Sequence, residues 1–180
     1  MISSILGNSV VIFASARYSA FNLDSVTVFF VQQLAVADLT YTIVLLIPCA
    51  VTHIARGWVF GLTWCWVNGY LIAFLSPVGF FLTMMISVHR ILRCYYPMKM
   101  VNFNRTHGII TVILIWALSL VSTTAFLAYI WHEPQTIPQM NPALPLCYFN
   151  VSADTYPLLL KIHLIVFMGI PFQVRLFYCL

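Results

Sequence analysis

Long apolar stretches with almost no charge determine what this chain can fold into. Residues 108–131 contain no Asp, Glu, Lys or Arg, and residues 26–54 contain one, Asp38. A helix needs about 20 apolar residues to cross the hydrocarbon core of a bilayer, whereas a surface helix of a soluble protein carries a polar face. These stretches therefore predict membrane-spanning helices.

The composition agrees with lipid as the solvent. Of the 180 residues, 62% are hydrophobic and 7% are charged, whereas soluble domains carry about 25% charged residues. The five cysteines contain no CxxC pair, and the histidines lack metal-ligand spacing, so no disulfide scaffold or metal site is expected. No carboxylate pair or Ser/His/Asp set indicates an enzyme. The net charge of +4 comes from residues beside apolar segments, which is not the pattern of a nucleic-acid-binding protein.

The apolar segments predict an all-α, polytopic bundle of transmembrane helices in a single domain. The first segment would rise only about 24 Å, less than the roughly 30 Å of the hydrocarbon core. It lacks the basic start of a signal peptide, so we expect a truncated first span. The last segment is predicted to span although it contains Lys161, His163 and Arg175. The expected spans are residues 1–16, 26–54, 66–94, 107–131 and 156–180 of the domain 1–180.

The connections between the spans differ in charge, and this difference predicts the orientation. By the positive-inside rule, the side with more lysine and arginine is cytoplasmic, which places the N-terminus outside. Residues 132–155 contain four prolines and are expected to form a long extracellular loop. The cytoplasmic side carries five basic residues (Arg17, Arg90, Arg93, Lys99, Arg105) and the extracellular side two (Arg56, Lys161).

Short motifs follow one another along the predicted spans. Residues 7–11 read GNSVV, residues 34–38 read LAVAD, and residues 58–61 read WVFG. Arg90 stands 25 residues after Cys65. The later positions in the series are Pro97, Trp116, Cys147 and Pro171.

In this order and at these spacings, the residues resemble the rhodopsin-like (class A) G-protein-coupled receptor family. The resemblance implies a seven-helix fold, of which five helices are expected here, because the CWxP and NPxxY motifs of the last two do not occur. It implies a multi-pass receptor of the plasma membrane that passes an extracellular ligand signal to a heterotrimeric G protein. Two alternatives stay open: a non-signalling fragment that binds full-length receptors as a dimer, and a transporter or channel subunit.

The resemblance implies a disulfide between Cys65 and Cys147. Both cysteines are expected on the extracellular side, where disulfides persist. The bridge would close a loop of about 80 residues and stabilise the fold by on the order of 4 kcal/mol. Asn150 in the same loop begins a sequon and is a predicted glycosylation site. The sequon at Asn104 is expected to stay bare because it faces the cytosol.

Asp38 is the only acid within a predicted span. An ionised carboxylate there must be paired, hydrated or neutralised. In the family this aspartate holds a sodium ion, and Asn8 matches its hydrogen-bonding partner. Gly79 stands where the third span usually offers a hydroxyl. A sodium site and a protonated, hydrogen-bonded Asp38 both remain open.

Arg90 matches the arginine that the family uses for G-protein coupling, and Pro97 and Met98 match the adjoining inner loop. Arg90 would lie about 37 Å along a helix from Cys65, at the cytoplasmic mouth. The preceding acid of the family is His89 here, which cannot supply an anion. We therefore expect a weaker resting restraint on Arg90. The alternative is that Arg90 only reaches lipid headgroups.

Ligand contacts are expected from Tyr70, Ile72, Ala73 and Ser76 of the third span. Amine receptors of the family place an aspartate seven residues after the outer cysteine, where this chain has Ile72. A cationic amine anchored there is not expected, and the residues suit a peptide, a lipid or a small neutral ligand. Pro77 predicts a bend in the same span.

Overall fold

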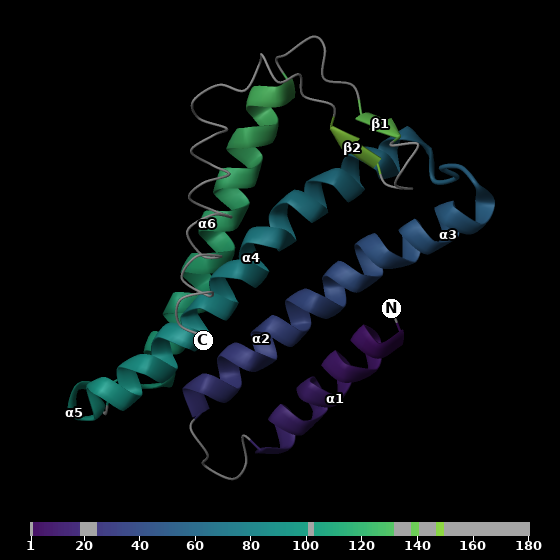
Figure 1. Ribbon diagram of the computed structural model, residues 1–180. Helices are drawn as coiled ribbons and strands as arrows, with labels where there is room; N and C mark the ends of the chain where they lie inside the picture. Colours follow the sequence, from purple (N-terminus) through teal and green to yellow (C-terminus); the bar gives the residue numbers. More distant parts are fainter. Residues whose placement is uncertain (1, 19–24, 101–102, 132–137, 141–146, 150–180) are drawn as a thin grey trace.

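The computed structural model describes residues 2–18, 25–100, 103–131, 138–140 and 147–149. These residues form long helices and one short pair of strands (Figure 1). In chain order the elements are α1 (Ile2–Tyr18), α2 (Ser25–Tyr41), the π-helix η2 (Thr42–Leu46), α3 (Ile47–Ala55), α4 (Gly61–Tyr95), α5 (Pro97–Met100), α6 (Arg105–Trp131), β1 (Pro138–Met140) and β2 (Cys147–Phe149).

Three stretches of the described chain are helical, long and apolar enough to cross a membrane. They are Val26–Ala55, Gly61–Tyr95 and Arg105–Ala128, and α1 is a shorter apolar helix. The prediction of an all-α bundle of membrane helices is therefore confirmed. The expected span 66–94 lies within α4, which already begins at Gly61. The expected span 156–180 lies outside the described residues.

Helix α4 is the central helix of the described bundle. It packs against α2 on one side and α6 on the other, while α1 packs along α2 (Figure 1). Its 35 residues rise about 52 Å, more than the roughly 30 Å of a hydrocarbon core, so part of it extends beyond the membrane. Helices α2, α4 and α6 share a hydrophobic core. Its buried residues are Val26, Phe30, Ala37, Val78, Leu82, Ile86, Val112 and Ile115.

A glycine brings α6 close to α2. A Cβ atom at Gly108 would lie 3.1 Å from Cγ1 of Val26, with Phe29 and Phe30 just beyond. This separation is shorter than an ordinary van der Waals contact. The close approach of α2 and α6 therefore depends on glycine, which has no side chain, at position 108.

The connection between α3 and α4 is a tight turn with two residues in the left-handed region. Arg56 has φ 54° and Gly61 has φ 75°. The Trp58 indole donates a 2.8 Å hydrogen bond to the Gly61 carbonyl oxygen, and its ring packs edge-on against Phe60. This geometry explains the WVFG motif, because the indole closes the turn and glycine adopts the required positive φ without strain.

Two short strands lie within the region that was expected to form only an extended loop. β1 and β2 pair antiparallel, with Met140 opposite Cys147, and both contact α4 (Figure 1). Each strand has three residues, and β1 begins with Pro138, a residue that the interior of a sheet excludes. The sequence therefore offers no alternating apolar pattern from which this pair could have been predicted.

Candidate functional site

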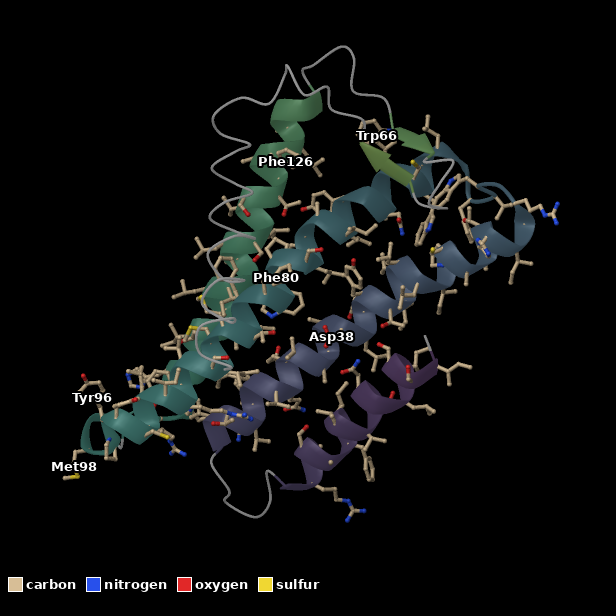
Figure 2. The ribbon with its side chains drawn as sticks, viewed as in Figure 1. Asp38, Trp66, Phe80, Tyr96, Met98 and Phe126 are labelled. Atoms are coloured by element: carbon tan, nitrogen blue, oxygen red, sulfur yellow. The ribbon has the colours of Figure 1, made fainter. Side chains whose placement is uncertain are left out.

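Asp38 lines a cavity of about 340 Å³ between α2 and α4. Figure 2 shows Asp38 in the last turn of α2 and Phe80 on α4, and both residues line this cavity. The volume has room for several water molecules or a hydrated ion. The described residues that line it are Leu34, Ala37, Asp38, Tyr41, Leu75, Ser76, Gly79, Phe80 and Thr83.

Two hydroxyl groups face the same cavity from α4. Ser76 donates to the Ile72 carbonyl oxygen and Thr83 to the Gly79 carbonyl oxygen, each at 2.8 Å. Because each hydroxyl donates its proton within its own helix, its lone pairs remain available as acceptors. A Cβ atom at Gly79 would meet nothing within 4 Å. The cavity thus combines a carboxylate, the hydroxyl-bearing residues Tyr41, Ser76 and Thr83, and free space at Gly79, where the family usually has a further hydroxyl.

A hydrogen-bond relay joins α1 to the backbone of Asp38. The Asn8 amide donates to the Ser4 carbonyl oxygen at 2.9 Å, and the Ser4 and Thr42 hydroxyls lie 2.8 Å apart. Thr42 donates in turn to the Asp38 carbonyl oxygen at 2.8 Å. Sequence reasoning did not identify Ser4 and Thr42, and a hydrogen bond from Asn8 to the Asp38 carboxylate stays a prediction.

His89 and Arg90 point into different surroundings at the other end of α4. His89 is buried, with Nδ1 3.1 Å from the Thr27 hydroxyl of α2. Its ring packs edge-on against Phe30 and tilted against Phe103. Arg90 is exposed. The residue that replaces the family's acid is therefore a packing residue between α2, α4 and the start of α6.

Aromatic contacts extend this cluster to α6. The Phe103 ring stacks on His107 with the centroids 5.6 Å apart. The Asn104 side-chain oxygen accepts from the His107 backbone N–H at 3.2 Å and lies 2.8 Å from His107 Nδ1. Asn104 thereby caps the N-terminus of α6. The side chain that would carry a glycan takes part in this cap through its oxygen.

The end of α4 and the short helix α5 project from the bundle. Tyr96 and Met98 mark this tip in Figure 2. Met98 is 84% exposed and Tyr95 77%. Cys94 is a free, exposed thiol beside them. The tip therefore offers an apolar and aromatic surface next to the exposed Arg90.

The four expected ligand contacts lie at different places along α4. The Tyr70 hydroxyl is 3.1 Å from that of Thr124 on α6. Tyr70 also lines a second cavity, of about 360 Å³, whereas Ser76 lines the Asp38 cavity. The Ala73 carbonyl oxygen accepts a hydrogen bond from α6, and the Ile72 carbonyl oxygen accepts from Ser76. The second cavity is lined by Trp66, Val67, Tyr70, Leu71 and Leu127.

Cys65 is buried in the first turns of α4 and is disulfide-bonded, while Cys49 and Cys94 are free. Strand β2, which contains Cys147, contacts the same helix. The described residues contain no group of three or more His, Cys, Asp or Glu that could hold a metal ion.

Comparisons with known proteins agree with this architecture. The model of the 7 transmembrane receptor (rhodopsin family) matches residues 7–180. The alpha-1A adrenergic receptor of Bos taurus is 29% identical over 157 residues, which are 84% of this chain and 33% of that receptor. Neuropeptide FF receptor 2 of Mus musculus is 28% identical over 131 residues, 72% of this chain and 31% of that receptor. This chain thus spans about a third of the length of these relatives.

A solved structure shares the fold. The crystal structure of squid rhodopsin superposes with a TM-score of 0.78 at 20% identity, over 99% of this chain and 47% of that one. The family prediction is therefore confirmed, and with it a multi-pass membrane protein from a family of receptors rather than enzymes. Members of this family act with ligands and G proteins. The chain belongs to the rhodopsin family of seven-transmembrane receptors.

Proposed function

We propose that the chain forms the ligand-receiving and G-protein-coupling part of a receptor of the plasma membrane. The observation that carries this proposal is the position of Arg90, which is exposed in the last turns of α4, before the projecting tip that carries Met98. A guanidinium there can form hydrogen bonds with backbone carbonyl groups of an inserted partner helix. The heterotrimeric G protein is the partner, and it would dock at this tip.

The orientation follows from the same assignment. The tip that carries Arg90 and Arg93 lies in the cytosol, and the N-terminus and the strands β1 and β2 lie outside. Cys65 then pairs with Cys147 in the oxidising compartment. The contact between β2 and α4 supports this pairing. Such a bridge would hold the extracellular loop over the outer end of α4.

The ligand is a peptide, a lipid or a small neutral molecule. Helix α4 contains no Asp or Glu, and Ile72 stands where an amine-binding acid would be needed. The cavity beside Tyr70 is lined by Trp66 and by the aliphatic Val67, Leu71 and Leu127. An apolar cavity with one hydroxyl favours an uncharged ligand group. We expect no organic cofactor and no transition metal, and sodium binding at Asp38 stays a separate hypothesis.

A chimeric receptor tests coupling. Residues 7–180, which match the family model, replace the corresponding segment of the bovine alpha-1A adrenergic receptor. Nucleotide exchange on added G proteins is then measured in membranes without ligand. We expect measurable exchange that Arg90→Ala abolishes at equal surface expression. Arg93→Ala, three residues further along α4, is the matched control and should retain most of it. Equal exchange in the parent and Arg90→Ala would exclude Arg90 as the coupling residue.

A further inference from the structure

Two prolines within the described helices leave carbonyl groups without their helical donors. Pro48 stands in the first turn of α3, and Pro77 lies inside α4. Proline has no N–H, so the carbonyl four residues earlier loses its α-helical hydrogen bond. For Pro77 this carbonyl is that of Ala73. For Pro48 it is that of Val44, at the point where the π-helix η2 gives way to the α-helix α3. In a membrane, no water is present to replace the lost donors.

A side chain from a neighbouring helix donates to each of these two carbonyls. The Asn68 amide of α4 donates to the Val44 oxygen at 2.5 Å. The Thr123 hydroxyl of α6 donates to the Ala73 oxygen at 3.3 Å. Asn68 is 1% exposed and Thr123 is fully buried. Both donors therefore act where water cannot compete.

The bond made by Thr123 differs from those of Thr111 and Thr124 on the same helix. The hydroxyls of Thr111 and Thr124 donate to carbonyls one turn earlier in α6, those of His107 and Leu120. This local bond is the usual arrangement for a threonine inside a helix. Thr123 instead donates across to α4, to a carbonyl that a proline has left open.

We infer that Asn68 and Thr123 act with Pro48 and Pro77 as two proline clamps that fix α4 between its neighbours. Helix α4 is the donor in the first clamp and the acceptor in the second. Along α4, Pro77 lies between Tyr70 and Ala73 on one side and Gly79, which lines the Asp38 cavity, on the other. The second clamp therefore sets how the outer part of α4 lies relative to α6, and it does so whether or not the chain couples to a G protein.

A double-mutant cycle on the 180-residue chain tests the clamp. Thr123→Val removes the donor at nearly constant volume, and Pro77→Ala returns an N–H that can satisfy Ala73 from within α4. Unfolding temperatures are measured in detergent micelles from the helical circular dichroism signal. Thr123→Val should lower Tm by about 2–4 °C in the parent. It should have less than half that effect in the Pro77→Ala background.

Three comparisons make the outcome unambiguous. Thr123→Ser keeps the donor and should stay closer to the parent than Thr123→Val does. Thr111→Val should give the same change with or without Pro77→Ala. If a Thr123 variant does not fold, the cycle of Asn68→Leu with Pro48→Ala decides. Equal effects of Thr123→Val, or of Asn68→Leu in that case, in both proline backgrounds would overturn the inference.

Discussion

The Nδ1 atom of His89 lies 3.1 Å from the Thr27 hydroxyl, so α4 is joined to α2 at the residue immediately before Arg90. The imidazole is buried against Phe30 and Phe103 rather than extended toward solvent with Arg90. The family's acid would hold that arginine by a charge-assisted hydrogen bond of about 1.5–3 kcal/mol. This chain instead uses the position to pack α4 against the start of α2 and the residues before α6.

The first prediction concerns basal activity. In the chimeric receptor, His89→Asp should lower ligand-free nucleotide exchange by up to about tenfold, because about 1.4 kcal/mol of added restraint on Arg90 shifts a two-state equilibrium by that factor. Thr27 can donate a hydrogen bond to the new carboxylate. The measurement is exchange on matched amounts of both variants in membranes, and an equal or higher rate for His89→Asp would contradict the prediction.

A second prediction concerns the Asp38 cavity. Asp38→Asn keeps the volume but removes the charge, so ligand-induced signalling of the chimera should fall while surface expression stays nearly unchanged. Gly79→Ser should fit without clashes and add a further hydroxyl oxygen. If the cavity binds sodium, ligand affinity should respond more strongly to sodium in Gly79→Ser than in the parent, and not at all in Asp38→Asn. An identical sodium response in all three would exclude an ion at this place.

The topology gives a third prediction. In mammalian cells, Asn150→Gln should remove the glycan from the chain, whereas Asn104→Gln should leave the glycosidase-sensitive mass unchanged. Asn104 caps α6 through its side-chain oxygen, and its sequon lies on the side with more positive charge. Asn104→Gln should still destabilise the chain by about 1 kcal/mol through loss of the cap. The reverse glycosylation pattern would invert the proposed orientation.

Two glycines should respond oppositely to added side chains. Gly79→Ala should stabilise the chain by about 0.5–1 kcal/mol, since alanine favours helix and the added methyl group meets open space. Gly108→Leu should destabilise it by about 1–3 kcal/mol, because its Cβ alone would come within 3.1 Å of Val26. Thermal unfolding in detergent compares both with the parent. Similar shifts for the two variants would show that α2 and α6 do not approach closely at Gly108.

Hydropathy and motifs predicted the family, the membrane helices and the all-α fold. These properties follow from local composition and spacing. Residues 108–131 contain no charged side chain that water would have to hydrate. The spacing of Cys65 and Arg90 is read directly along the chain. Helix α4 begins before the expected span 66–94, because the helix also includes Gly61, Thr63 and Cys65, which are outside that span. In the structure these residues form the first turns of the helix all the same.

Contacts between helices could not be predicted in the same way. The partners of His89, Asn68 and Thr123 lie on other helices, and their identities depend on how those helices cross. One signal was present: a proline inside a span leaves a carbonyl open, and a buried polar residue in another span is a candidate donor for it. Pro77 was interpreted only as the cause of a bend, and Thr123 was overlooked.

The π-helical segment Thr42–Leu46 also determines how a one-residue insertion or deletion would affect the helix that continues into α3. Its wider turns contain one residue more than regular α-helical turns would. In an uninterrupted α-helix, an inserted residue would rotate everything beyond it by about 100°. Here the extra residue is absorbed locally, so the buried Thr52 keeps its face toward the bundle. A deletion within this segment, such as that of the half-exposed Ile43, should therefore convert it to α-helix and leave the outer turns facing as before. A change in length of one residue within η2 would thus leave the orientation of α3 unchanged. Residues beyond Leu46 would then lie one position nearer to Asp38, or one further from it, along the chain.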